Sequence, residues 1–203
     1  MNSKVRTRLV AISGVTGSGK TTLANNLAAE LPDSSVFRFE HYQAAANEAQ
    51  GENFVLHDHE AWNAVDYDPN RILGKPPGFD DLQKLLNGES VHPPGVRDAI
   101  LPGTTIILED AFSRDLDILR DLIDVAIHIS VPLDIALCRA LLRFERNGSD
   151  PMPWVHNYLT YSLHYFYARV EKVRRTADLI IDGTRAPDVV LEEALAFLGS
   201  KSA

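Results

Sequence analysis

The feature that most constrains this chain is the stretch Gly14-Val-Thr-Gly-Ser-Gly-Lys-Thr21. It matches the pattern of a glycine, any four residues, a glycine, a lysine and then a serine or threonine. The run before it, residues 9–13, is apolar and suits a buried parallel strand, while residues 22–31 carry leucines at helical spacing up to Pro32. Strand, glycine-rich loop and helix in this order predict a phosphate-binding loop (P-loop). The sequence therefore predicts binding of a nucleoside triphosphate.

The roles within the loop follow from its chemistry. Lys20 is expected to contact the β- and γ-phosphates, and the Thr21 hydroxyl to bind Mg²⁺. Backbone N–H groups of the loop and the first turn of the helix are expected to surround the phosphate oxygens. The predicted ATP-binding residues of this segment are Gly14, Thr16, Gly17, Ser18, Gly19, Lys20, Thr21 and Thr22.

Length and composition indicate one globular domain over residues 1–203. Hydrophobic residues make up 45% and charged residues 24%, as in ordinary folded domains. A formal net charge of -8 argues against a nucleic-acid partner, and no apolar run approaches the length of a membrane span. A cleavable signal would remove the strand that the loop requires, so we expect a cytoplasmic protein. The single cysteine, Cys138, excludes an internal disulfide and is expected to be a buried, inert thiol.

Strand-like and helix-like segments alternate along the rest of the chain. Short apolar runs at residues 36–39, 104–110, 124–131 and 177–182 predict four more buried strands. Helical patterns follow at residues 79–86, 133–147 and 154–175, and from Pro187 onward. This alternation predicts a three-layer α/β/α fold around a parallel sheet of about five strands.

Acidic residues stand at the ends of two of these strands. Glu40 follows residues 36–39, and Glu109 and Asp110 follow the apolar run 104–108. Ligands of open α/β sheets bind at the carboxyl ends of the strands, so these carboxylates are expected to face the ATP site. An apolar strand ending in an acid is the Walker B pattern, in which the carboxylate holds Mg²⁺. Glu109 is our first choice for this metal site, together with Thr21, and Asp110 is the second.

The chain resembles the uridine kinase, phosphoribulokinase and nicotinamide riboside kinase group of small-molecule kinases. The segments that carry this resemblance are the P-loop, Glu40-His41-Tyr42, residues 53–62 and the strand ending at Glu109. The resemblance runs over about residues 8–185. It implies that Glu40, where these kinases have an aspartate, orients the acceptor hydroxyl and takes its proton. It also implies substrate contacts for Tyr42, Asp58 and His59. A metal site built from His57, Asp58 and His59 is the less favoured interpretation of that cluster, because no third ligand is evident.

The predicted helix 133–147 carries arginines at helical spacing. Arg139 and Arg143 are one turn apart, and Arg146 lies near the same face. The resemblance implies a lid over about residues 139–153, with Arg139 on the adenine and Arg143 and Arg146 on the triphosphate. Lys20, Glu40 and Arg143 would then be the catalytic residues. A solvated basic helix face is the alternative reading of the same spacing.

The acceptor side departs from the related kinases. The loop of residues 91–98 lacks the tyrosine that they often carry there, and Arg97 is the residue of this loop that we assign to substrate binding. The predicted function is transfer of the γ-phosphoryl group of ATP to a hydroxyl of a small metabolite, such as a nucleoside, a ribosyl or sugar-like compound, or a vitamin precursor, by a monomer or homodimer. Two alternatives stay open: a nucleotide-hydrolysing or regulatory protein, and a degenerate kinase relative without turnover of a small molecule.

Overall fold

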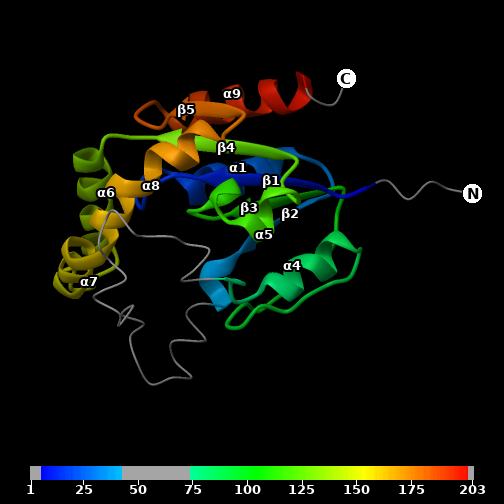
Figure 1. Ribbon diagram of the computed structural model, residues 1–203, viewed down its shortest axis with the longest axis horizontal. Coiled ribbons are helices and arrows are strands. Elements are labelled where there is room, and N and C mark those ends of the chain that lie inside the picture. The colour runs from blue at the N-terminus through cyan, green and yellow to red at the C-terminus, as the bar shows by residue number, and fades with distance from the viewer. Residues whose placement is uncertain (1–5, 43–73, 201–203) are drawn as a thin grey trace, which may run out of the picture.

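The computed structural model describes residues 6–42 and 74–200, and the account below concerns these residues (Figure 1). Asp58 and His59, expected to contact the substrate, lie outside them, as does His57. Across the described residues, no helix is long and apolar enough to cross a membrane.

Five parallel strands form one sheet. The strands are β1 (Arg8–Ser13), β2 (Ser34–Arg38), β3 (Thr105–Glu109), β4 (Val125–Ser130) and β5 (Leu179–Asp182). Their order across the sheet is β2-β3-β1-β4-β5, and every neighbouring pair is parallel. The predicted five-stranded parallel sheet is thus confirmed. β1 is the central strand, so the loop after it lies at the middle of the carboxyl ends of the strands. This is the point from which the strand order continues to β3 on one side and to β4 on the other, and open α/β sheets bind ligands at such a point.

Helices cover both faces of this sheet. Side chains of β1 alternate, so that Val10 and Ile12 pack with α1 (Lys20–Glu30) and α9 (Pro187–Ser200). Leu9 and Ala11 pack on the other face with α4 (Phe79–Leu86) and α5 (Asp117–Arg120). Figure 1 shows α9 and α4 on opposite sides of the sheet. The strands are apolar on both faces because both faces are buried.

A third group of helices stands at the carboxyl ends of the strands. It consists of α6 (Leu133–Arg146), α7 (Met152–Asn157), the π-helical turn η3 (Tyr158–Ser162) and α8 (Leu163–Arg175). The expected single helix 154–175 is therefore interrupted by a π-helical turn. Tyr158 stacks on Trp154 and is buried against Val15 and Ala136. Figure 1 shows α6 and α7 at the end of the sheet away from the N-terminus.

Helix α6 ends where its sequence indicates. Gly148 follows the last turn with a φ of 65°, a conformation that glycine adopts without strain. Its N–H donates to Glu145, and the N–H of Ser149 donates to Phe144, which closes the helix in a Schellman motif. The helix buries Ala136 and Ala140. Cys138 lies midway between them, on the outer face, and is exposed, so the expectation of a buried thiol was wrong.

Candidate functional site

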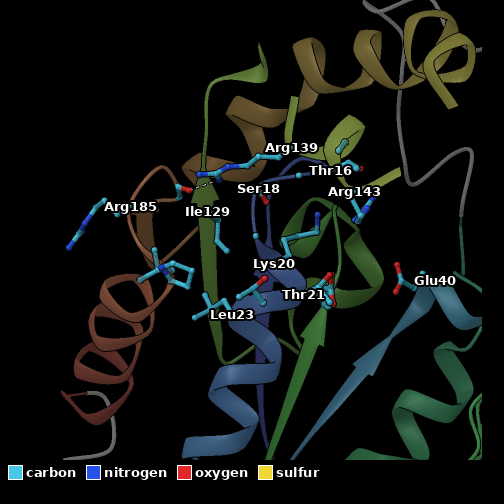
Figure 2. A pocket seen from close by; sticks show the side chains of 18 of the residues that line it. Thr16, Ser18, Lys20, Thr21, Leu23, Glu40, Ile129, Arg139, Arg143 and Arg185 are labelled. Carbon is cyan, nitrogen blue, oxygen red and sulfur yellow. Dashed lines mark hydrogen bonds between the residues drawn. The ribbon is translucent and has the colours of Figure 1, made fainter. Parts of the chain in front are cut away.

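A cavity of about 650 Å³ lies at the carboxyl ends of the strands (Figure 2). The P-loop forms one wall, α6 and the segment after β5 form others, and the ends of β2 and β3 each contribute an acid. Its polar lining includes Thr16, Ser18, Lys20, Thr21, Thr22, Glu40, Glu109, Arg139, Arg143, Arg146 and Arg185. Most of the residues predicted to bind ATP are therefore brought together in one hollow.

Lys20 begins α1, as predicted, and its side chain folds over the loop. The ammonium Nζ donates to the carbonyl oxygens of Gly14 (2.9 Å) and Val15 (3.1 Å). Burial lowers the pKa of Lys20, and the carboxylates of Glu109 and Glu40 act in the opposite direction. The lysine thus lies within electrostatic reach of both strand-end acids.

The loop is in direct contact with α6. Gly17 has a φ of 85°, and a Cβ added there would lie 2.1 Å from the carbonyl oxygen of Ala136 on α6. Ser18 places a buried hydroxyl in the loop that has no hydrogen-bond partner among the described residues. Buried polar groups are rarely left unpaired, so this hydroxyl and the loop N–H groups suit an anionic ligand.

Thr21 and Glu109 form a pair of oxygen ligands beside Lys20. The Thr21 hydroxyl donates to Glu109 Oε1 at 2.5 Å. Hard oxygen donors of this kind fit Mg²⁺, which in phosphate sites usually keeps only one or two protein ligands and takes the rest from phosphate and water. Within residues 6–42 and 74–200, no group of three or more histidine, cysteine, aspartate or glutamate side chains is arranged to hold a metal. The pair therefore fits a metal that is shared with a nucleotide.

Asp110, the second choice for the metal site, has a different partner. Its Oδ2 accepts the backbone N–H groups of Phe112 (3.0 Å) and Ser113 (2.7 Å), which shapes the turn into η2 (Ser113–Asp115). Burial raises the pKa of Asp110, and these hydrogen bonds oppose the rise. Asp110 thus stabilises the turn after β3, and the Thr21–Glu109 pair stays our predicted metal site.

Three arginines of α6, Arg139, Arg143 and Arg146, line the cavity, and the first two lie at different parts of it. Arg139 Nη1 donates to the carbonyl oxygen of Gly183, 2.7 Å away, and Figure 2 shows it extending toward the segment after β5. Arg185 and Pro187 line the same end of the cavity. Arg143 lies on the side of Lys20 and Glu40 in Figure 2, and acts on the pKa of Lys20. The expected roles of Arg139 at the adenine and of Arg143 and Arg146 at the triphosphate stay predictions.

The predicted acceptor residues are less closely grouped. Glu40 lies in a helical turn that directly follows β2 and lines the cavity. The Tyr42 hydroxyl donates to Asp81 Oδ2 at 2.8 Å, and its ring packs on Phe37. Tyr42 thus lines a smaller neighbouring hollow with residues 75–81. Arg97 is exposed in the loop after α4 and is not part of the cavity lining.

Three polar residues near the site were missed in the sequence. Arg38 donates to Glu109 and to Asn25, and Arg185 lines the cavity near Gly183 and Pro187. Arg38 is the last residue of β2, and its place in the sequence does not show which side chain it meets. Only the pairing of β2 with β3 reveals that it meets Glu109.

A parallel sheet of this order, with helices on both faces and a P-loop after the central strand, defines the P-loop kinase fold. No family model matches the chain. The chain is 27% identical over 210 residues to the uridine kinase of Borrelia turicatae (strain 91E135), covering 96% of this chain and 97% of the relative. It is 27% identical over 189 residues to the uridine kinase of Staphylococcus aureus (strain JH9), covering 86% and 87%.

A solved structure has the same fold. TT1252 from Thermus thermophilus superposes with a TM-score of 0.58 at 16% identity, covering 98% of this chain and 99% of that one. The chain is thus a distant homologue of the uridine kinases, over nearly its full length.

Proposed function

We propose that this protein is a phosphotransferase that moves the γ-phosphoryl group of ATP to a hydroxyl of a small metabolite. One observation carries the proposal: a single cavity contains the P-loop lysine and lid arginines at one place and the carboxylate of Glu40 beside them. Phosphoryl transfer requires positive charge around the transferring group and a carboxylate at the acceptor oxygen. Both are supplied here by separate elements of the fold.

The donor half follows from the loop and the lid. Loop N–H groups and the start of α1 bind the phosphates, and Lys20 leaves its two carbonyl partners to contact the γ-phosphoryl group. Arg143 and Arg146 add guanidinium donors, and Arg139 with Pro187 encloses the base. Thr21 and Glu109 would hold Mg²⁺, which would supply further positive charge to the phosphates. The segment 139–153 acts as the lid that excludes water.

The acceptor half depends on Glu40. Its carboxylate lies at the end of β2, next to the end of β3, so a hydroxyl held between Glu40 and the γ-phosphate is in line for transfer. Glu40 accepts the hydroxyl proton as the new bond to phosphorus forms and the bond to ADP breaks. The names of the sequence relatives make uridine the first acceptor to test, and sugars and vitamin precursors the next.

The test is acceptor-dependent release of ADP by the purified protein. We expect at least one hydroxyl compound to stimulate release, and Glu40→Gln to abolish the stimulation while ATP binding is kept. Glu30→Gln, at the exposed end of α1, is the matched control and keeps full activity. ATP binding with no response to any acceptor, and no effect of Glu40→Gln, would instead favour a regulatory or degenerate relative that binds nucleotide without transfer.

A further inference from the structure

Arg38 makes a buried ion pair with the predicted metal ligand. Arg38 and Glu109 are register partners on the adjacent strands β2 and β3, and both side chains point to the face covered by α1. Arg38 Nε donates to Glu109 Oε2 at 2.7 Å, and the two side chains are only 17% and 7% exposed. Few solvent molecules can screen this pair, so its geometry and charge act strongly on Glu109.

The guanidinium is itself held in place. Arg38 Nη2 donates to Asn25 Oδ1 at 2.6 Å, and Asn25 lies one helical turn after Thr21 on α1. Arg38 therefore connects β2, β3 and α1. The same helix presents Thr21 to the other oxygen of Glu109, Oε1, so the two carboxylate oxygens have different partners.

This arrangement affects how the acid can bind a metal. A carboxylate that is neutralised by a guanidinium attracts a free divalent cation much less than an unpaired one. Additional negative charge is then needed to attract the metal to this pair, and the phosphates of a bound nucleotide would supply it beside Thr21 and Glu109. The ion pair also fixes the rotation of the carboxylate, because one oxygen is held toward β2 while the other faces Thr21.

We propose that Arg38 is a positioning residue and counter-ion for Glu109, which keeps the Thr21–Glu109 pair from loading free divalent cation so that the metal enters together with the nucleotide. The proposal rests on the proposed function only in taking Thr21 and Glu109 as the metal ligands. It does not depend on which acceptor is used, or on any acceptor being used.

Binding of Mn²⁺, measured by its electron paramagnetic resonance signal without any acceptor, tests the proposal. The wild type is expected to bind Mn²⁺ weakly alone and much more tightly with a non-hydrolysable ATP analogue. Removing the positive charge in Arg38→Gln is expected to tighten binding of Mn²⁺ alone by about tenfold. Arg38→Lys keeps the charge and stays close to wild type, and Arg120→Gln, which removes an exposed arginine on α5, is the matched control.

Thermal melting gives a second readout that also reports on folding. Arg38→Gln leaves Glu109 buried without its cation, so Mn²⁺ alone should raise the melting temperature of this variant and leave that of the wild type almost unchanged. If the wild type binds Mn²⁺ alone as tightly as with the nucleotide analogue, or if Arg38→Gln gains no affinity and no thermal stabilisation from the metal, the proposal is overturned. Failure of the kinase function alone would leave both readouts intact.

Discussion

Replacing Gly17 by alanine tests whether the P-loop and α6 are packed as closely as the structure indicates. A Cβ at Gly17 would lie 2.1 Å from the carbonyl oxygen of Ala136, while real Cβ atoms keep at least 3.0 Å, so the loop and α6 must separate by about 0.9 Å. Overpacking of this kind costs about 1–3 kcal/mol. The φ of 85° adds about 1–2 kcal/mol for a residue with a side chain.

We therefore expect Gly17→Ala to lose about 3 kcal/mol of folding free energy, equivalent to a fall in melting temperature of roughly 6–12 °C for a chain of this size. The ATP analogue should bind at least about tenfold more weakly, because the displaced loop N–H groups no longer converge on the phosphates. Thermal unfolding and calorimetric titration with the analogue measure the two effects.

Gly95→Ala is the matched control. Gly95, in the loop after α4, has a similar φ of 70°, but a Cβ there meets no atom within 4 Å. This control variant should lose only the folding free energy that the positive φ costs a residue with a side chain, about 1–2 kcal/mol. It should bind the ATP analogue as tightly as the wild type does. Equal melting temperatures and equal nucleotide affinities for the two variants would refute the close contact between the loop and α6.

Two further predictions concern buried titratable residues, Asp115 and His128. Asp115 is fully buried and accepts two hydrogen bonds from Arg169, so Asp115→Ala should lower the free energy of unfolding, measured in urea, by about 3–5 kcal/mol. Asp117 forms an exposed ion pair, and Asp117→Ala should lower it by less than about 1 kcal/mol. Similar losses in the two variants would contradict this account. Burial, assisted by Arg174, lowers the pKa of His128 from 6.5 to about 4, so its contribution to stability is complete above pH 6.5 and is lost as the pH falls toward 4. Between pH 7 and pH 4.5, the free energy of unfolding should fall by about 2 kcal/mol less in His128→Asn than in the wild type. The same fall in both proteins would exclude His128 as a source of the pH dependence.

The fold and the donor half of the site were predictable because their signals are local. An apolar run, a glycine-rich loop and a helical leucine pattern lie within residues 9–31, and each dictates its own backbone conformation. The structure places the loop, Glu40, Glu109 and three arginines of α6 around one cavity. Their roles in catalysis stay predictions.

The contacts that depend on strand register were not predictable. Arg38 meets Glu109 because β2 and β3 are in register, and residues from distant parts of the chain give no local sign of this. The hydrogen bond from Tyr42 to Asp81 likewise depends on how α4 docks on the sheet, and it directs the tyrosine toward α4. The exposure of Cys138 was missed for a simpler reason: an apolar helical pattern does not reveal which face is covered when only two alanines are buried.

Transfer of labelled phosphate from ATP to an acceptor tests the central claim most directly. The protein is incubated with ATP labelled in the γ-phosphoryl group and with candidate hydroxyl compounds, beginning with uridine, and mass spectrometry follows the label. We predict that the label appears on the acceptor, that Glu40→Gln reduces the rate by about 100-fold or more, and that Glu30→Gln leaves it unchanged. Label that appears only as inorganic phosphate, at a rate independent of every acceptor and of Glu40, would contradict the assignment of this site to phosphoryl transfer.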